Sequence, residues 1–182
     1  MVSHTFAICA YKQSPYLEEC ICSLTAQTVK SNIIIATSTP NDYIKALAEK
    51  YHLSLYINQG ESGIAQDWNF AYRQAKTDYV TIAHQDDYYQ PEYLENILNG
   101  LKCAKDPIIA FSDYGELRNG QKVDRNQLLT IKRILLLPLR IKGLWKSVRA
   151  RRLCLSLGNP VCCPSTTYVK KKFPEEPFQV KY

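Results

Sequence analysis

Apolar residues along the first 113 positions follow two alternating patterns. Short unbroken apolar runs are typical of strands buried on both faces of a sheet, and segments with three- and four-residue apolar spacing are typical of helices. The runs predict strands over residues 5–10, 32–37, 53–57, 79–83 and 108–113. The periodic segments predict helices over residues 14–24, 44–51, 64–75 and 91–101. This alternation indicates βαβ units and a doubly wound α/β fold with a largely parallel sheet.

The pattern changes after residue 117. Arg118-Asn119-Gly120-Gln121 has the composition of a hairpin turn. Residues 128–157 are rich in leucine, isoleucine and arginine, and Pro138 and Gly143 interrupt them. Since proline and glycine both disfavour a continuous helix, this segment predicts two basic amphipathic helices.

Length and composition fit one globular domain. The chain has 182 residues, of which 46% are hydrophobic and 22% charged, enough for one sizeable core. Beyond the basic helices, Val161–Val169 predicts a last strand. We divide the domain into an α/β part, residues 1–117, and a second part, residues 118–182.

No apolar stretch approaches the roughly 20 residues that cross a bilayer, and no signal peptide is visible, so we expect a cytoplasmic protein.

The basic residues are unevenly distributed. Twelve of the 23 lysines and arginines lie between Arg125 and Pro174, where no acidic residue occurs, and the other eleven stand against all 17 acids. Such an uneven distribution of charge gives information about binding partners and none about the fold. One interpretation is a solvated helix face. The leucines and Trp145 among the cations favour a second interpretation, in which residues 128–157 contact the inner face of a membrane. Binding of nucleic acid is disfavoured, because the cations alternate with leucines and not with stacking aromatics spaced along a groove.

The cysteines and histidines follow no known metal or disulfide pattern. Seven cysteines are an odd number without a CxxC pair, and His4, His52 and His84 are widely separated. We therefore expect neither a zinc site of the usual spacing nor a disulfide framework.

The fourth predicted strand runs directly into His84-Gln85-Asp86-Asp87. Ligands of open α/β sheets bind at the carboxyl ends of the strands, and carboxylates there hold Mg²⁺ or Mn²⁺ against nucleotide phosphates. The alternative is a polar turn in which Asp86 or Asp87 begins a loop. Asp113, at the end of the fifth strand, either adds a ligand contact at this edge or caps a turn.

Three stretches, in this order, resemble the family 2 glycosyltransferases: Phe6–Leu24, Asn58–Ala75 and His84–Asp87. Gly158-Asn159-Pro160 with Cys162-Cys163-Pro164-Ser165 is similar to the acceptor-side strand of some bacterial members. These are inverting enzymes that use nucleotide sugars and have the GT-A fold, a Rossmann-like, mostly parallel sheet flanked by helices. The resemblance covers most of the chain and implies a bacterial glycosyltransferase of polysaccharide and cell-envelope biosynthesis.

The resemblance also implies a set of site residues. Asp86 matches the second acid of the family's metal-binding DxD element and His84 stands at the first, which implies that they bind Mn²⁺ or Mg²⁺. The implied contacts to the nucleotide-sugar donor, a UDP-sugar, are Ala10, Tyr11, Ser38, Asn41, Gln66, Asn69, Gln85 and Asp87. The implied acceptor-side residues are Asp113, Asn159 and Ser165. The implied acceptor is a glycan or a lipid-linked precursor.

Three departures from the family pattern affect these expectations. His84 replaces the first acid of the DxD element, and its imidazole either binds Mn²⁺ or is a structural hydrogen-bonding group. Ser38 replaces an aspartate after the second strand, so contacts to uracil or ribose differ and involve Asn41 or Asp42. The family's general base is an acid beyond the acceptor-side strand, where only Glu175 and Glu176 lie near. We therefore assign no base and expect the chain to be C-terminally short.

Two other functions remain open on the sequence. One is a non-catalytic GT-A domain that binds a membrane surface or nucleic acid through its basic segment. The other is a nucleotidyltransferase, which shares the chemistry of metal and phosphate. Such an enzyme usually carries a glycine-rich, lysine-bearing loop after the first strand, and Ala10-Tyr11-Lys12-Gln13 lacks one.

Overall fold

The computed structural model describes residues 3–118, 120–141 and 143–179. The chain forms two compact units. The first contains residues 1–110 and 166–182, and the second contains residues 111–165. The last part of the chain thus returns to the first unit, whereas the division drawn from the sequence placed everything after residue 117 together.

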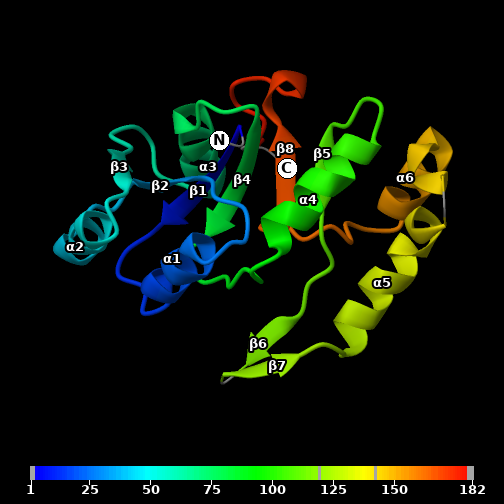
Figure 1. Cartoon of the computed structure of the whole chain (residues 1–182), viewed down its shortest axis with the longest axis horizontal. Coiled ribbons are helices and arrows are strands. Elements are labelled where there is room, and N and C mark those ends of the chain that lie inside the picture. The colour runs from blue at the N-terminus through cyan, green and yellow to red at the C-terminus, as the bar shows by residue number, and fades with distance from the viewer. Residues whose placement is uncertain (1–2, 119, 142, 180–182) are drawn as a thin grey trace. The chain divides into compact units, whose positions relative to one another are not determined.

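The first unit is built on a mixed sheet of six strands, in the order β3-β2-β1-β4-β8-β5 (Figure 1). The strands are β1 (His4–Ala10), β2 (Asn32–Thr37), β3 (Ser54–Ile57), β4 (Tyr79–His84), β5 (Ile109–Phe111) and β8 (Thr166–Val169). β1 pairs in parallel with β2 on one side and with β4 on the other, and β2 pairs in parallel with β3. β8 runs antiparallel to β4. The predicted α/β class and largely parallel sheet are therefore confirmed.

The last strand is shorter than predicted. Residues 161–165 are not part of the strand, and only Thr167–Val169 pair with β4. The hydroxyl of Ser165 donates to the carbonyl of Cys162 at 2.9 Å. This local bond belongs to a turn, so the apolar composition of the segment was a misleading signal for a strand over Val161–Val169.

Four helices and a short 3₁₀ turn complete the first unit. They are α1 (Leu17–Thr25), α2 (Asp42–Lys50), α3 (Ile64–Gln74), α4 (Tyr93–Cys103) and η2 (Lys170–Lys172). α1 and α4 begin two or more residues later than the prolines predicted, because residues 15–16 and 91–92 form turns. The side chain of Asn41 caps α2 by accepting the N–H of Ile44 at 3.0 Å.

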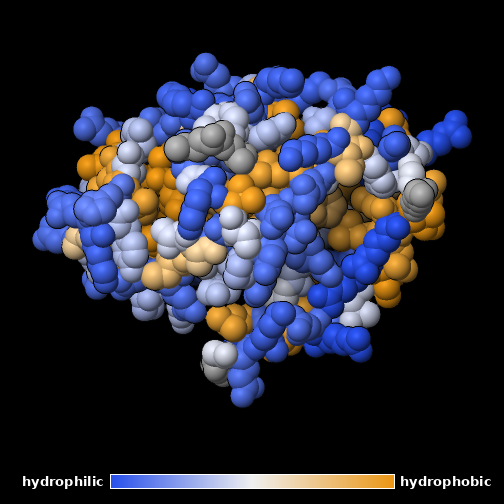
Figure 2. Space-filling view, viewed as in Figure 1, coloured by the Kyte–Doolittle hydropathy of each residue, from blue (hydrophilic) through white to orange (hydrophobic). Residues whose placement is uncertain are grey.

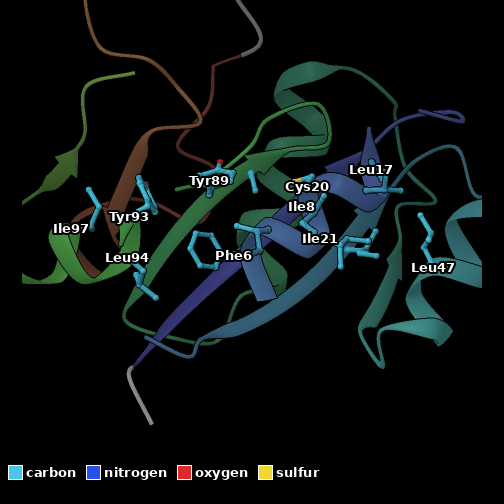
Figure 3. Packing of buried hydrophobic residues seen from close by; sticks show 14 of the residues in the cluster. Phe6, Ile8, Leu17, Cys20, Ile21, Leu47, Tyr89, Tyr93, Leu94 and Ile97 are labelled. Atoms are coloured by element: carbon cyan, nitrogen blue, oxygen red, sulfur yellow. The ribbon is translucent and has the colours of Figure 1, made fainter. Parts of the chain in front are cut away.

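Alternate side chains of the strands face two separate apolar cores. Phe6 and Ile8 of β1 face a core that α1, α2 and α4 cover, shown in Figure 3. Ala7 of β1 and Ile82 of β4 face the opposite core, which α3 covers through Ala71 and its neighbours. Since both faces of the sheet are covered, the central strands are buried along their length, which explains their unbroken apolar runs.

A chain of buried polar side chains crosses the sheet beside the first core. The ring of His4 bonds Ser31 at 2.7 Å and Thr81 at 2.9 Å. Thr81 bonds Thr167 at 2.6 Å, and Thr167 bonds Tyr93 at 3.2 Å. The chain joins β1, β4, β8 and α4 through groups that would be costly to bury unpaired.

The second unit contains a hairpin and two helices. Its elements are β6 (Glu116–Arg118), β7 (Gln121–Val123), α5 (Gln127–Arg140), η1 (Leu144–Lys146) and α6 (Val148–Ser156). β6 pairs antiparallel with β7, as the predicted turn requires, although Asn119 of that turn lies outside the described residues. α5 packs against η1 and α6.

The two predicted basic helices are confirmed, but the break between them is not where Pro138 suggested. Pro138 lies inside the last turn of α5, where it removes a single helical hydrogen bond and the helix continues to Arg140. The break follows at Gly143, whose φ of 87° is a left-handed conformation that favours glycine.

Burial lowers the pKa of His4 to about 3, which makes folding sensitive to acid. The ring stays neutral in the folded protein but binds a proton below its ordinary pKa of 6.5 when the chain unfolds. Stability from this residue is therefore complete above pH 6.5 and falls towards pH 3, by up to about 1.4 kcal/mol per pH unit. Urea unfolding at several pH values should show the advantage of the wild type over His4→Gln shrinking as pH falls. The exposed His52, changed to asparagine, is the control and should show no such trend.

Ile21 on α1 is fully buried in the first core, whereas Ile64 on α3 is 73% exposed. Ile21→Ala should lower the free energy of unfolding by about 2–5 kcal/mol, because a cavity remains. Ile64→Ala should change it by less than about 0.5 kcal/mol. Equal effects in chemical unfolding would contradict the packing described for α1.

Candidate functional site

The strand order reverses between β1 and β4. β2 and β3 continue the sheet on one side of β1, and β4 lies on its other side, with Cys9 opposite His84. The carboxyl ends of these two neighbours are the switch point of the sheet, where open α/β sheets bind ligands. The residues that leave this point are Tyr11 after β1 and His84–Asp87 at the end of β4.

The side chain of Gln85 joins the ends of the two strands. Its carbonyl oxygen accepts the N–H of Tyr11 at 3.0 Å, and its amide donates to the carbonyl of Tyr11 at 2.9 Å. These bonds extend the ladder between β1 and β4 past the last paired residues. Gln85, expected from the family resemblance to touch the donor, is here a residue that positions the loop of Tyr11.

His84, Asp86 and Asp87 converge at this edge. One potential metal-ligand atom of each lies within 4.8 Å of the others, and Nδ1 of His84 is 3.6 Å from the carboxylate of Asp87. Burial, and then the charge of Asp86, raises the pKa of Asp87 to about 6. Burial lowers the pKa of His84 more than Asp86 raises it. The imidazole is therefore neutral near pH 7 and keeps a lone pair to donate.

This group of three residues suits a divalent cation. Nε2 of His84 is buried and has no hydrogen-bond partner within the part of the chain that the structure describes. Two carboxylates with one imidazole nitrogen form a donor set that Mn²⁺ accepts readily, and Mg²⁺ accepts the carboxylates. A cation here would also offset the repulsion between Asp86 and Asp87, which helps to keep the pKa of Asp87 high.

Trp68 of α3 supports the ring of His84 from one side. The two rings stack with centroids 5.0 Å apart and planes 27° from parallel. Phe178, far along the chain, contacts Trp68 edge-on at 5.3 Å. The buried amide of Asn69 holds Phe178 by donating to its carbonyl at 2.8 Å and accepting its N–H at 2.9 Å. Asn69, expected to contact the donor, is engaged with the C-terminal segment.

A second polar group lies beyond the carboxyl ends of β2 and β3. The hydroxyl of Ser38 donates to one carboxylate oxygen of Asp67 at 2.8 Å, and the amide of Asn58 donates to the other at 3.0 Å. Ser38 was expected at the donor site from the sequence. The roles of Asn58 and Asp67 in orienting it were missed, since only the fold brings the three residues together.

The other residues expected to contact the donor differ in their exposure and in whether their side chains are already hydrogen-bonded. Tyr11 is 50% exposed, and Nζ of Lys12 is 5.2 Å from the centroid of its ring. Ala10 is buried at the end of β1 and Gln66 is partly buried on α3. Asn41 already uses its side-chain oxygen to cap α2. Tyr11 thus offers an exposed aromatic side chain at the switch point to a planar ligand.

The expected acceptor-side residues all belong to the second unit and are bonded within it. Asp113 accepts from Arg133 at 2.9 Å and from Arg140 at 3.3 Å. Asn159 accepts the N–H of Val161 at 3.2 Å. The hydroxyl of Ser165 is close to the carbonyl of Ser112, at 3.1 Å.

Glu175 and Glu176 are the acids near the expected position of the general base, and the geometry of neither identifies it as that base. Glu176 pairs with Arg73 of α3. Glu175 is exposed in the loop that follows Pro174. No base is assigned to either residue.

Comparisons with known proteins agree with this architecture. The sequence profile named Glycosyl transferase family 2 matches residues 5–173. Glycosyltransferase GlyA of Streptococcus pneumoniae is 28% identical over 98 residues, which are 51% of this chain and 14% of that protein. A fragment of S. aureus TarS, residues 1–349, superposes with a TM-score of 0.63 at 20% identity, covering 99% of this chain and 52% of that one. The same fragment has been solved in complex with UDP-GlcNAc.

Another similar structure is glucosyl-3-phosphoglycerate synthase from Mycobacterium tuberculosis, in complex with Mn²⁺ and UDP-glucose. It superposes with a TM-score of 0.62 at 12% identity, covering 92% of this chain and 56% of that one. These structural likenesses confirm the predicted GT-A architecture. The chain spans about half or less of the proteins it matches here.

The bonds between Gln85 and Tyr11 predict a measurable effect on stability. Gln85→Leu removes both bonds and should lower the free energy of unfolding by about 1 kcal/mol, since water can reach the freed groups. Gln13→Leu, in the exposed loop after β1, is the control. A loss for Gln85→Leu no larger than for the control would mean that these bonds do not hold the edge together.

Proposed function

The chain belongs to glycosyltransferase family 2, and from this premise we propose that it transfers a sugar from a UDP-sugar donor to a hydroxyl of a glycan or lipid-linked acceptor. The observation that carries the proposal is the convergence of His84, Asp86 and Asp87 at the switch point, beside the exposed ring of Tyr11. A nucleoside diphosphate needs both features, a cation site for its phosphates and a flat surface for its base.

In the proposed reaction the acceptor hydroxyl attacks the anomeric carbon of the donor. The bond from that carbon to the diphosphate oxygen breaks with inversion of configuration, the proton of the hydroxyl passes to solvent, and UDP is released. Negative charge grows on the diphosphate as the bond breaks, so groups that stabilise this charge lower the barrier. A bound Mn²⁺ or Mg²⁺ supplies that stabilisation as a Lewis acid.

The chain's own residues prepare the site for this charge. Asp86, the exposed acid of the three, and His84, neutral near pH 7, would hold the cation. Trp68 fixes the plane of the His84 ring by stacking on it. Asp87 is half-buried beside them and would either complete the metal site or bond a sugar hydroxyl.

The nucleoside has two candidate contacts. The exposed face of Tyr11 would stack on uracil, and Gln85 keeps the backbone of Tyr11 at the edge of β4. The Ser38–Asp67–Asn58 group would bond the ribose or the base, with Asp67 accepting. The complexes of similar proteins with UDP-GlcNAc and with Mn²⁺ and UDP-glucose support UDP-sugars as the first donors to test.

A calorimetric titration of UDP with and without Mn²⁺ tests the site. We expect UDP to bind with Mn²⁺ present, and Asp86→Asn to weaken that binding at least about tenfold. Asp78→Asn is the matched control, because Asp78 is an exposed acid at the opposite, amino end of the same strand. It should leave affinity unchanged.

Two results would contradict the proposed site. In the first, UDP binds Asp86→Asn as tightly as the wild type in the presence of Mn²⁺. In the second, the wild type binds neither UDP with Mn²⁺ nor Mn²⁺ alone, as followed by the electron paramagnetic resonance signal of free Mn²⁺. If UDP binds as expected, release of UDP from UDP-GlcNAc and UDP-glucose identifies the donor sugar.

A further inference from the structure

Exposed apolar side chains are concentrated in the second unit. Of the eighteen large hydrophobic side chains that lie exposed among the described residues, ten fall between residues 128 and 157. They are Leu128, Ile131, Ile134, Leu137, Ile141, Leu144, Val148, Leu153, Leu155 and Leu157. Single exposed apolar residues are ordinary, but such a concentration marks an interaction surface. We call α5, η1 and α6 together the basic helical surface.

The first helix of this surface, α5, leaves one apolar side exposed. Ile131, Ile134 and Leu137 recur every three residues, so they fall within about 120° of the helix circumference. All three are about half exposed. The rest of the helix is engaged within the second unit: Leu129 is buried, Arg133 bonds Asp113, and Lys132 bonds the hydroxyl of Tyr114 at 2.9 Å. The apolar side formed by Ile131, Ile134 and Leu137 remains open.

The rest of the surface adds cations that have no acidic partner. Lys146, Arg149, Arg151 and Arg152 are exposed, and no ion pair in the described part of the chain involves them. The sequence between Arg125 and Pro174 contains no acidic residue that could neutralise them locally. Figure 2 shows the result, with hydrophobic side chains lying directly beside strongly hydrophilic ones over α5 and α6.

We propose that the basic helical surface binds an anionic membrane surface, with its apolar side chains entering the headgroup region and its cations contacting lipid phosphates. Interfacial helices combine these two features, apolar side chains for the acyl boundary and lysines and arginines for the anionic headgroups. Trp145 of η1 is partly buried, with Nζ of Lys146 5.1 Å from its ring, and tryptophan is enriched at membrane interfaces. Among the described residues no helix is both long and apolar enough to span a bilayer.

Other occupants fit this surface less well. A second copy of the chain would place the same patch on both partners, and its unneutralised cations would repel each other. Single-stranded nucleic acid is held by several stacking aromatics along a groove, whereas residues 125–157 contain a single aromatic residue, Trp145. The proposal depends on the second unit alone and does not rest on the donor site.

Cosedimentation of the full chain with vesicles tests the proposal. Vesicles of phosphatidylcholine containing one third phosphatidylglycerol should bind the protein at least about tenfold more tightly than pure phosphatidylcholine, and salt should weaken the binding. Arg149→Glu/Arg152→Glu and, separately, Ile131→Ser/Ile134→Ser should each reduce binding at least about tenfold. These side chains are exposed, so circular dichroism and melting temperature should stay unchanged.

The matched control is Lys102→Glu/Lys105→Glu, which makes the same change of charge on exposed residues of the first unit. It should bind vesicles like the wild type. Equal binding to neutral and anionic vesicles, no binding to either, or equal loss in the control would overturn the proposal. It would also be overturned by tight RNA binding at physiological salt that Arg149→Glu/Arg152→Glu abolishes. A dimer in sedimentation velocity that Ile131→Ser/Ile134→Ser dissociates would instead identify a second copy as the occupant.

Discussion

The parallel pairing of β1 with both of its neighbours is the constraint on which the candidate site depends. β1 is buried on both faces and bonded on both edges, to β2 on one side and β4 on the other. Parallel strands end at the same edge of a sheet, so this pairing alone delivers Tyr11 and the acidic end of β4 to one place. Gln85 then extends the pairing by one residue through its side chain.

The electrostatics of that edge follow from burial. Asp87 and His84 are half-buried next to Asp86, so burial opposes charge on both of them, and Asp86 adds repulsion for Asp87. Such a group is unfavourable without a ligand, and a divalent cation relieves it. The aromatic contacts from Phe178 through Trp68 to His84 hold the imidazole in place, which links the C-terminal segment to the candidate metal site.

Local patterns predicted most of the elements. Apolar runs and helical spacing located β1, β2, β4 and the four helices of the first unit, because their burial is continuous and their periodicity strong. The acidic end of β4 was likewise visible as a candidate site. Errors arose where short-range bonding decided the structure, as in the turn over residues 161–165 and at Pro138, which lies inside α5. Composition is similar in a turn and a short strand, so it could not separate them.

The sequence by itself determined the class of sheet, the carboxylates at its edge and the imbalance of charge, since all three are properties of residue order. Only the tertiary structure decided which polar groups remain available. The side chain of Asn69 is hydrogen-bonded to Phe178, and that of Gln85 to Tyr11. The carboxylate of Asp67 accepts hydrogen bonds from Ser38 and Asn58. The tertiary structure likewise showed that α5 leaves Ile131, Ile134 and Leu137 exposed on one side. Hydrogen bonds and burial between residues distant in the chain depend on three-dimensional packing, which local periodicity does not encode.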